Sequence, residues 1–342
     1  MIIKGRKIGY QYNPLVIAEI GINHNGSLKV AKEMVDAACR AGIEIIKHQT
    51  HVIEDEMSNS AKNIIPGNAD KSIYDIMKSC ALNEEEEWEL MKYVHAKDMI
   101  FVSTPFSRKA VDRLVKFDVP AFKIGSGECN NFPLLNYIAS FGKPIILSTG
   151  MNNISTIKKS VRILEKYKID YALLHTTNLY PTPDNLVRLG AINELQKTFP
   201  DALVGLSDHT LTNHACFAAV ALGASILERH FTDTMKREGP DIICSMDEEA
   251  ARELIQGVNI ISQQRGGNKN LIEEEQITRD FAFASVCSIK PIKCGEKLTK
   301  KNIWVKRPGK GGIPAENYED ILNKIAVVDI PFDVQLKYEF FK

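Results

Sequence analysis

Two histidines occupy equivalent places in two consecutive strand-like segments. His209 comes just after the apolar segment 202–206, and His230 comes just after the segment 225–227. Because neighbouring parallel strands lie about 4.8 Å apart, imidazoles at the same end of both strands can converge on one point. Imidazole binds several transition metals, and two histidine ligands leave coordination positions open for a substrate. The pair therefore predicts a metal centre, and the alternative is that each imidazole only makes a structural hydrogen bond.

Other expected strand ends also carry polar side chains, as an active site at one end of a barrel requires. In chain order these are Glu19, Lys47 with His48, Ser103 with Thr104, Lys123 with Ser126 and Glu128, Ser148, Asn178, Ser207 with His209, and Glu228 with His230. Two lysines among small hydroxyl donors favour a site for a phosphate or a carboxylate. The competing interpretation is a lysine that forms a Schiff base with a carbonyl substrate.

These residue types predict a metal-assisted reaction of a carbonyl compound with a phosphorylated or carboxylated anion. A divalent ion between His209 and His230 would polarise the carbonyl oxygen. The carboxylates Glu19, Glu128 and Asp241 can act as bases, bind sugar hydroxyls or be purely structural. The residues alone leave open an aldol-type condensation, an isomerisation and a hydrolysis.

The elements that must position these residues are apolar strands that alternate with amphipathic helices from Val16 to about Ile261. The expected strands are 16–21, 43–48, 100–104, 121–125, 144–149, 171–175, 202–206 and 225–227, and the expected helices include 28–41, 84–96, 108–116, 134–140, 155–167, 191–198 and 248–264. Eight strand–helix units in about 250 residues are typical of a (β/α)8 (TIM) barrel. A doubly wound open sheet is the alternative, but no GxGxxG follows the first strand.

Two segments depart from this alternation. Segment 52–82, which contains Pro66-Gly67-Asn68, is too long for an ordinary connection. We expect it to form a lid or rim over the mouth of the barrel, the alternative being a surface insertion. We also expect the catalytic barrel to span residues 1–266, a polar linker residues 267–279, and a small separate unit residues 280–342. Short apolar runs between Cys-Gly and Pro-Gly turns predict a compact, loop-rich β module there, which needs support from the barrel or a partner chain.

The bulk composition disfavours several classes of partner. Lysine and arginine together number 43, as do aspartate and glutamate, which gives no support to nucleic acid or an anionic membrane as the main partner. No run approaches the roughly 20 apolar residues needed to span a bilayer, and the opening MIIKGRKIGYQYNPL lacks the apolar core of a signal peptide. The seven cysteines are scattered and form no CxxC pair, so we expect a reducing compartment, by default the cytoplasm.

The order of short motifs along the chain resembles that of the bacterial sialic acid synthases. The motifs are IAEIGINHNGSL, KHQT followed by EDEMS, VSTPFS, KIGSGECNN, ILSTGMN, NLYPTP, GLSDHT, LERHFT with GPD behind it, and DFAFAS with KRPG. The resemblance covers about Pro14 to Arg307 and, more loosely, the rest of the chain. The KHQT and EDEMS versions look like the N-acetylneuraminate branch, whereas the legionaminate and pseudaminate branches usually carry other residues there.

This resemblance implies a transferase that condenses phosphoenolpyruvate with N-acetylmannosamine and water to give N-acetylneuraminate and phosphate. It implies a divalent metal, Mn²⁺ or Mg²⁺, because those ions suit a site completed by oxygen ligands. It also implies that the C-terminal module is an antifreeze-like (SAF) domain. In this family that domain covers the barrel of the other subunit in a domain-swapped homodimer.

The family's functional residues are carried over one by one onto this sequence. The resemblance implies a phosphoenolpyruvate site at Lys47, Lys123, Ser126, Ser148, Asn178 and Ser207, and metal ligands at His209 and His230. It implies a sugar site at Glu128, Tyr180 and Asp241, completed by Phe281 and Arg307 of a partner chain. Glu19 would lie near the reacting carbons and orient or deprotonate the water that adds to the enol carbon.

Three alternatives remain at this point. The same condensation on a diacetamido-trideoxyhexose would give legionaminate or a relative. A binding protein with an inactive barrel is a second alternative, although intact Glu19, His209 and His230 argue against it. An aldolase that cleaves sialate through a Schiff-base lysine, without a metal, is a third.

Overall fold

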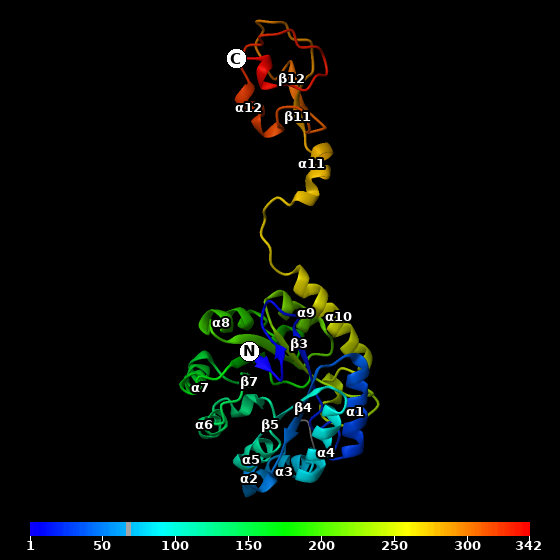
Figure 1. Cartoon of the computed structure of the whole chain (residues 1–342), viewed down its shortest axis with the longest axis vertical. Coiled ribbons are helices and arrows are strands. Elements are labelled where there is room, and N and C mark those ends of the chain that lie inside the picture. The colour runs from blue at the N-terminus through cyan, green and yellow to red at the C-terminus, as the bar shows by residue number, and fades with distance from the viewer. Residues whose placement is uncertain (66–69) are drawn as a thin grey trace. The chain divides into compact units, whose positions relative to one another are not determined.

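The computed structural model describes residues 1–65 and 70–342, so Pro66-Gly67-Asn68 of the long insertion lie outside the described residues. The chain forms two compact units, Met1–Gly266 and Gly267–Lys342 (Figure 1). The first unit carries the strand–helix alternation, and the second is the small C-terminal module.

In the described part of the chain, the first unit is a closed barrel of eight parallel strands (Figure 1). The strands are β3 (Leu15–Glu19), β4 (Ile45–Thr50), β5 (Ile100–Pro105), β6 (Phe122–Ile124), β7 (Ile145–Ser148), β8 (Tyr171–Thr176), β9 (Leu203–Asp208) and β10 (Ile226–His230). Helices α1 (Leu28–Ala41), α4 (Glu84–His95), α5 (Arg108–Lys116), α6 (Phe132–Ala139), α7 (Ile154–Lys166), α8 (Gly190–Thr198), α9 (His214–Ala221) and α10 (Glu248–Gln264) follow the strands. Strand β10 pairs with β3 and closes the sheet, so the predicted (β/α)8 barrel is confirmed.

The interior of the barrel is apolar at one end and polar at the other. An inner cluster contains Leu15, Ile17, Ile45, Ile100, Val102, Ala121, Ile146, Ala172, Leu174 and Ile226. A hairpin of β1 (Ile2–Ile3) and β2 (Arg6–Lys7) adds Ile3 and Ile8 to this cluster. Because alternate strand residues face the same side, the next inward positions toward the C-terminal ends are those of Glu19, Lys47, Thr104, Lys123, Ser148, Thr176, Ser207 and Glu228. The period of the strands thus places the polar residues in one layer.

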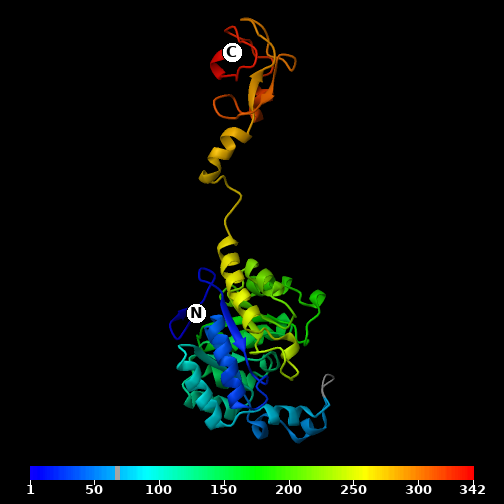
Figure 2. The same cartoon turned by 90° about the vertical axis from the view of Figure 1, so that its right-hand side faces the viewer.

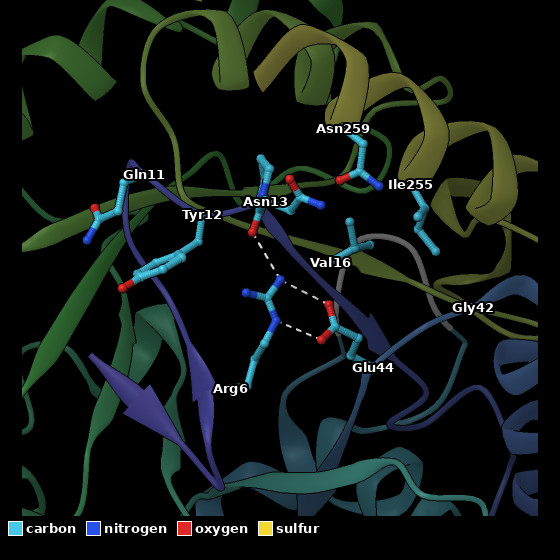
Figure 3. A pocket seen from close by; sticks show the side chains of 10 residues that line it. Arg6, Gln11, Tyr12, Asn13, Val16, Gly42, Glu44, Ile255 and Asn259 are labelled. Atoms are coloured by element: carbon cyan, nitrogen blue, oxygen red, sulfur yellow. Dashed lines mark hydrogen bonds and ion pairs between the residues drawn. The ribbon is translucent and has the colours of Figure 1, made fainter. Parts of the chain in front are cut away.

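Arg6 fastens the N-terminal hairpin to the barrel beside a cavity of about 500 Å³ (Figure 3). Its guanidinium donates to both carboxylate oxygens of Glu44, at 2.7 and 3.0 Å, and to the carbonyl oxygen of Asn13 at 3.0 Å. A bidentate pair of this kind fixes geometry as well as contributing energy. The donors of Arg6 are therefore used by the protein itself, and we interpret this cavity as structural.

Local signals explain where α1 and β4 begin and end. The Ser27 side chain accepts the N–H of Val30 at the start of α1, and Gly42, at φ 88°, ends the helix, as the sequence predicts. The N–H of Ile43 is donated to Ala38 in the turn that ends α1. Strand β4 therefore begins at Ile45 instead of the predicted residue 43.

The long insertion after β4 is partly helical in its described portion. It contains α2 (Ile53–Glu56), a 3-10 turn η1 (Asn59–Asn63) and α3 (Ile73–Cys80). In Figure 2 these light-blue segments lie at the end of the barrel away from the N-terminal hairpin. Because β4 ends at Thr50, the insertion starts at the mouth formed by the C-terminal strand ends.

The second unit has a small core of its own. After residue 282, strand β11 (Ser285–Ser288) pairs antiparallel with β12 (Ile303–Lys306), and the rest is made of loops with η6 (Ala315–Asn317), α12 (Tyr318–Ile321) and η7 (Tyr338–Phe340). Buried apolar side chains such as Val286, Leu298 and Leu336 pack together inside it. This is the loop-rich β module that the sequence predicts.

The segment before this module differs from the predicted linker. The polar linker predicted for residues 267–279 contains η5 (Glu273–Glu275) and most of helix α11 (Gln276–Ala282). Gln276 donates to Asp280 at 2.7 Å and accepts from Arg279 at 3.1 Å. Side chains three and four residues apart stabilise a helix locally, and these two bonds support a short helix that has no buried residue.

Across residues 1–65 and 70–342, no helix combines the length and the apolar character needed to cross a membrane.

Candidate active site

A cavity of about 490 Å³ opens at the C-terminal ends of the barrel strands. It is lined by most of the predicted site residues, namely Lys47, Lys123, Ser126, Glu128, Ser148, Asn178, Tyr180, Ser207, His209, His230 and Asp241. Glu19 lies next to this lining, where it pairs with Lys47. Polar groups from all eight strands or the loops that follow them therefore meet at the mouth, as in other barrels of this kind.

Two lysines and one carboxylate form the floor of the cavity. Lys47 Nζ lies 3.7 Å and Lys123 Nζ lies 3.5 Å from the same Oε1 atom of Glu228. Ser207 donates to that oxygen at 3.2 Å, and Lys123 donates to Ser148 Oγ at 2.7 Å. Lys123 also donates to the carbonyl oxygen of Ile124 at 3.2 Å, and Lys47 donates to Thr104 Oγ1 at 3.4 Å, so a phosphate or carboxylate in the cavity would bind by replacing some of these partners.

The ionisation of this floor follows from burial and mutual attraction. Burial lowers the pKa of Lys47 to about 8, against the opposing effect of Glu228. Burial likewise lowers the pKa of Lys123. Burial acts to raise the pKa of Glu228, but Lys123 and Lys47 outweigh it and hold that pKa below its usual value. The floor is thus a buried cluster of charges whose partners can be exchanged for a substrate anion.

Glu19 is held at the end of β3 by two contacts. Its side chain pairs with Lys47 and accepts the N–H of Gly21. A Cβ on residue 21 would collide with the carboxylate of Glu19 and the side chain of Gln49, so this close approach requires glycine. In the strand register Glu19 stands beside both Lys47 and His230. It therefore lies between the lysine floor and the histidine pair.

Small polar groups surround one side of the floor. The N–H of Gly150 is donated to Ser126 Oγ at 3.1 Å, and a Cβ on residue 150 would overlap the amide of Asn178. Asn178 donates to the hydroxyl of Tyr180 at 3.4 Å, while its buried Oδ1 has no hydrogen-bond partner among the described residues. Buried polar atoms without partners are rare in native proteins, so this oxygen is a candidate contact for a ligand.

His209 and His230 lie side by side, with ring centroids 5.4 Å apart. His209 Nδ1 lies 2.9 Å from the carbonyl oxygen of Thr177, so Nδ1 carries the hydrogen and Nε2 is left with a free lone pair. His230 Nδ1 lies 3.6 Å from a carboxylate oxygen of Asp241 and has no hydrogen-bond partner within the described ranges. Burial lowers the pKa of both imidazoles, which keeps them neutral, as a metal ligand must be.

This donor set fits a divalent ion that is completed by other ligands. Within residues 1–65 and 70–342, no group of three or more His, Cys, Asp or Glu side chains is arranged to hold a metal. Two neutral imidazoles leave the remaining coordination positions to substrate oxygens and water. The predicted metal ligands are therefore brought together, and the binding of an ion by them stays a prediction.

Three further predicted residues line the outer part of the cavity. The Tyr180 ring lies 4.1 Å from the His209 ring, and burial raises the pKa of its hydroxyl. Burial raises the pKa of Asp241 to about 6, with Lys47 opposing it. Burial, reinforced by Glu56, raises the pKa of Glu128 to about 7. Carboxyl groups poised near neutrality can donate or accept hydrogen bonds, which suits the hydroxyls of a sugar.

The sequence reasoning missed one wall of the cavity. Gln49 and His51 continue the inward face that begins at Lys47, and the alternation of β4 could have revealed them. His51 bonds to Glu56 at 2.8 Å and to Gln49 at 3.1 Å. An apolar rim made of Ile22, Met57, Ile73, Ile76, Met77 and Phe106 stands beside them. Most of this rim comes from the insertion, so the expected rim over the mouth is confirmed for its described portion.

Two predicted sugar-site residues belong to the second unit. Phe281 is 60% exposed and Arg307 is also exposed in that unit. Neither is among the residues that line the cavity of the barrel. Their contribution from a partner chain stays a prediction.

Comparisons with known proteins cover almost the whole chain. The model of the NeuB family matches residues 34–270, and that of the SAF domain matches residues 283–341. An N,N'-diacetyllegionaminic acid synthase of Campylobacter jejuni is 37% identical, over 91% of this chain and 95% of the relative. The human N-acetylneuraminate-9-phosphate synthase is 31% identical, over 96% and 93%. A crystal structure of N-acetylneuraminic acid synthetase from Leptospira borgpetersenii, in complex with citrate, has a TM-score of 0.75 and 28% identity, covering 81% of this chain and 94% of that one.

Proposed function

The chain belongs to the NeuB family and is a transferase-type enzyme, and from this premise we propose that it condenses phosphoenolpyruvate with N-acetylmannosamine and water. The products are N-acetylneuraminate and phosphate. The observation that carries the proposal is the convergence of Lys47 and Lys123 on one buried carboxylate, beside a pair of neutral histidines. This arrangement can bind a doubly anionic substrate and a carbonyl compound next to each other.

Different residues of the cavity bind the two substrates and the metal ion in this proposal. Lys47 and Lys123, with Ser126, Ser148, Asn178 and Ser207, bind phosphoenolpyruvate and stabilise the phosphate as it leaves. Glu128, Tyr180 and Asp241 bind the hydroxyl groups of the open-chain sugar. His209 and His230 would hold a divalent ion, Mn²⁺ or Mg²⁺, which would supply Lewis-acid polarisation of a carbonyl oxygen.

The bond changes follow from this placement. The enol carbon of phosphoenolpyruvate forms a bond to the aldehyde carbon, whose oxygen becomes a hydroxyl after protonation. Positive charge develops at the carbon that bears the phosphate, and water adds there. Glu19, which pairs with Lys47, orients that water or takes its proton. Phosphate then leaves by C–O cleavage, which gives the 2-keto acid.

The second candidate is the same condensation with a diacetamido-trideoxyhexose as acceptor. The observation that favours it is the apolar rim at Met57, Ile73, Ile76 and Met77, which suits the methyl groups of such a sugar. The Campylobacter relative named for N,N'-diacetyllegionaminic acid supports the same alternative. The two candidates differ only in the acceptor.

The SAF module and its exposed residues extend the proposal to a dimer. We propose a domain-swapped homodimer in which Phe281 and Arg307 of one chain complete the sugar site of the other. The match of residues 283–341 to the SAF domain supports it, as does the small size of a core that would gain from a partner.

All seven cysteines are free in the structure, in keeping with the proposed cytoplasmic location.

Phosphate release by the metal-stripped protein tests the proposal. The protein is mixed with phosphoenolpyruvate and either N-acetylmannosamine or the diacetamido sugar, with and without Mn²⁺. We expect release only when N-acetylmannosamine and Mn²⁺ are both present. Release only with the diacetamido sugar would identify that sugar as the acceptor and leave the proposed mechanism unchanged. If no phosphate is released with either sugar, a binding protein is favoured. Borohydride trapping of pyruvate on a lysine would point to an aldolase.

A further inference from the structure

The segment between β3 and α1 holds an unfavourable backbone at the edge of the site. Ile22 has φ 56°, Asn25 has φ 47° and Gly26 has φ 71°. A β-branched residue such as isoleucine rarely adopts the left-handed region, so this conformation persists only where surrounding contacts over-determine it. Gly21 donates to Glu19, and Ile22 lines the cavity. The strained residue Ile22 is therefore itself a point at which the segment meets the site.

His24 anchors this segment through a buried chain of hydrogen bonds. His24 Nε2 lies 3.2 Å from His48 Nε2, and the two rings are stacked with centroids 5.2 Å apart. His48 Nδ1 lies 3.1 Å from Glu87 Oε1, and Arg113 donates to Glu87 Oε2 at 2.9 Å. His24 and His48 are each 1% exposed and Glu87 is fully buried. These hydrogen bonds thus connect the segment between β3 and α1, through β4, to helices α4 and α5.

The groups at the two ends of this series of hydrogen bonds determine which ring nitrogens of His24 and His48 carry a hydrogen. The N–H of Gly26 is donated to His24 Nδ1 at 3.2 Å, so Nδ1 is an acceptor and Nε2 carries the hydrogen. His48 must then accept at Nε2 and donate from Nδ1 to Glu87. Burial, with the neighbouring imidazoles of His48 and His51, lowers the pKa of His24 to about 3, which agrees with a neutral ring. Both ring nitrogens of His24 and of His48 thus have partners, so these hydrogen bonds specify one arrangement of the two rings.

We propose that His24 is a positioning residue that holds the Gly21 N–H on the Glu19 carboxylate. His48, its partner, is the neighbour of Lys47 in β4, and Lys47 is the ion-pair partner of Glu19. The hydrogen bond between the two histidines therefore fixes the position of the strained segment relative to Lys47. His24 does not line the cavity, so it acts through Gly21 and Ile22 and not on the substrate.

Asn23 gives the same segment a second attachment on its other side. Its amide donates to the carbonyl oxygen of Phe231 and to Ser245 Oγ, both at 2.9 Å, and Ser245 donates to the carbonyl oxygen of Asp241 at 2.8 Å. With Asn23 still in place, loss of the His24 bond should loosen the segment locally and leave the barrel folded. This makes His24 the residue to test.

Two substitutions of His24 distinguish a displacement of Glu19 from general damage to the core. In His24→Gln the side-chain nitrogen can still donate to His48, because it reaches as far as imidazole Nε2. In His24→Asn the side-chain oxygen can replace only Nδ1, the acceptor for Gly26. His95→Asn serves as a control, since this histidine ends α4 and lies near Lys4 of the N-terminal hairpin. All three variants are first compared with the parent by thermal unfolding.

The activity test rests on the proposed function and measures phosphate release. We expect His24→Asn to lower kcat by about 100-fold, the usual effect of a small misplacement of a catalytic group. Its KM for phosphoenolpyruvate should stay close to that of the parent, because the lysine floor does not move. His24→Gln should recover most of kcat, and His95→Asn should keep it. Equal kcat values for the Gln and Asn variants would overturn the proposal.

Hydrogen exchange provides a readout that does not depend on the substrate. Amide exchange of peptides that contain residues 20–27 should be faster in His24→Asn than in the parent, with His24→Gln close to the parent. Unchanged exchange in His24→Asn would overturn the proposal even if activity fell. If the parent released no phosphate with any sugar, the proposed function would fail, and the exchange result would still decide the role of His24.

Discussion

Replacing Glu228 with glutamine should destabilise the enzyme and make its stability depend more strongly on an added anion. Glu228 Oε1 lies 3.7 Å from Lys47 Nζ and 3.5 Å from Lys123 Nζ, and all three side chains are buried. Glutamine keeps the shape and can still accept the hydrogen bond of Ser207, but it carries no charge. Lys47 would then keep Glu19 as its carboxylate partner, whereas Lys123 would lose its ion pair with Glu228.

The size of the effect follows from these distances. At an effective dielectric constant of about 20, each of the two ion pairs contributes about 4 to 5 kcal/mol of Coulomb attraction. Burial of the charges offsets much of this sum, and removal of one partner from a buried pair commonly costs about 3 to 5 kcal/mol. We expect a loss of about 3 kcal/mol in the free energy of unfolding, at the low end of that range. The reason is that Lys47, whose pKa is already lowered to about 8, can release a proton in response.

Urea unfolding of the metal-free protein, with and without phosphoenolpyruvate, measures this prediction. The variant should be less stable than the parent without ligand and should gain more stability from phosphoenolpyruvate, because the anion replaces the missing carboxylate. Glu89→Gln is the matched control, since it breaks an ion pair with Lys32 at the surface, where such pairs contribute little. Equal stability losses in both variants, or an equal gain from phosphoenolpyruvate in variant and parent, would contradict the stabilising role of Glu228.

Three other predictions follow from the site. Glu19→Gln should lower kcat at least about 100-fold while the KM for phosphoenolpyruvate changes little, and equal losses in both constants would contradict its role with the water. His209→Ala should abolish Mn²⁺ binding measured by calorimetry, whereas His214→Ala, at an exposed position, should leave it intact; retained binding in the first variant would exclude the histidine pair. Glu128 has a pKa raised from 4.5 to about 7 by burial, so the folded state keeps a proton that the unfolded state loses, and stability falls as the pH rises from about 4.5 to 7. Glu128→Gln should therefore be more stable than the parent at pH 8 and equal to it below pH 4.5 in urea titrations, and a difference that does not vary with pH would contradict this origin.

Local pattern was sufficient to predict the barrel and most of the residues at its mouth. The alternation of strands and helices determines the fold class, and the residues after each strand are carried to one end because parallel strands share a direction. Lys47, Lys123, Ser148 and Ser207 were found in this way and all line the cavity. Helix α11 was missed because its stability comes from side-chain bonds between Gln276 and its neighbours and not from an apolar face.

The sequence pattern was sufficient to predict which residues face the interior, because side-chain direction in a strand depends only on its period of two. It also determined the family, through motifs spread along nearly the whole chain. Which of the inward groups touch one another depends on the closed barrel. The meeting of Lys47 and Lys123 at Glu228 joins three strands, and the bond between His24 and His48 joins a loop to a strand. Such contacts depend on strand register and on distances across the barrel, which are set only when all eight strands close into one sheet.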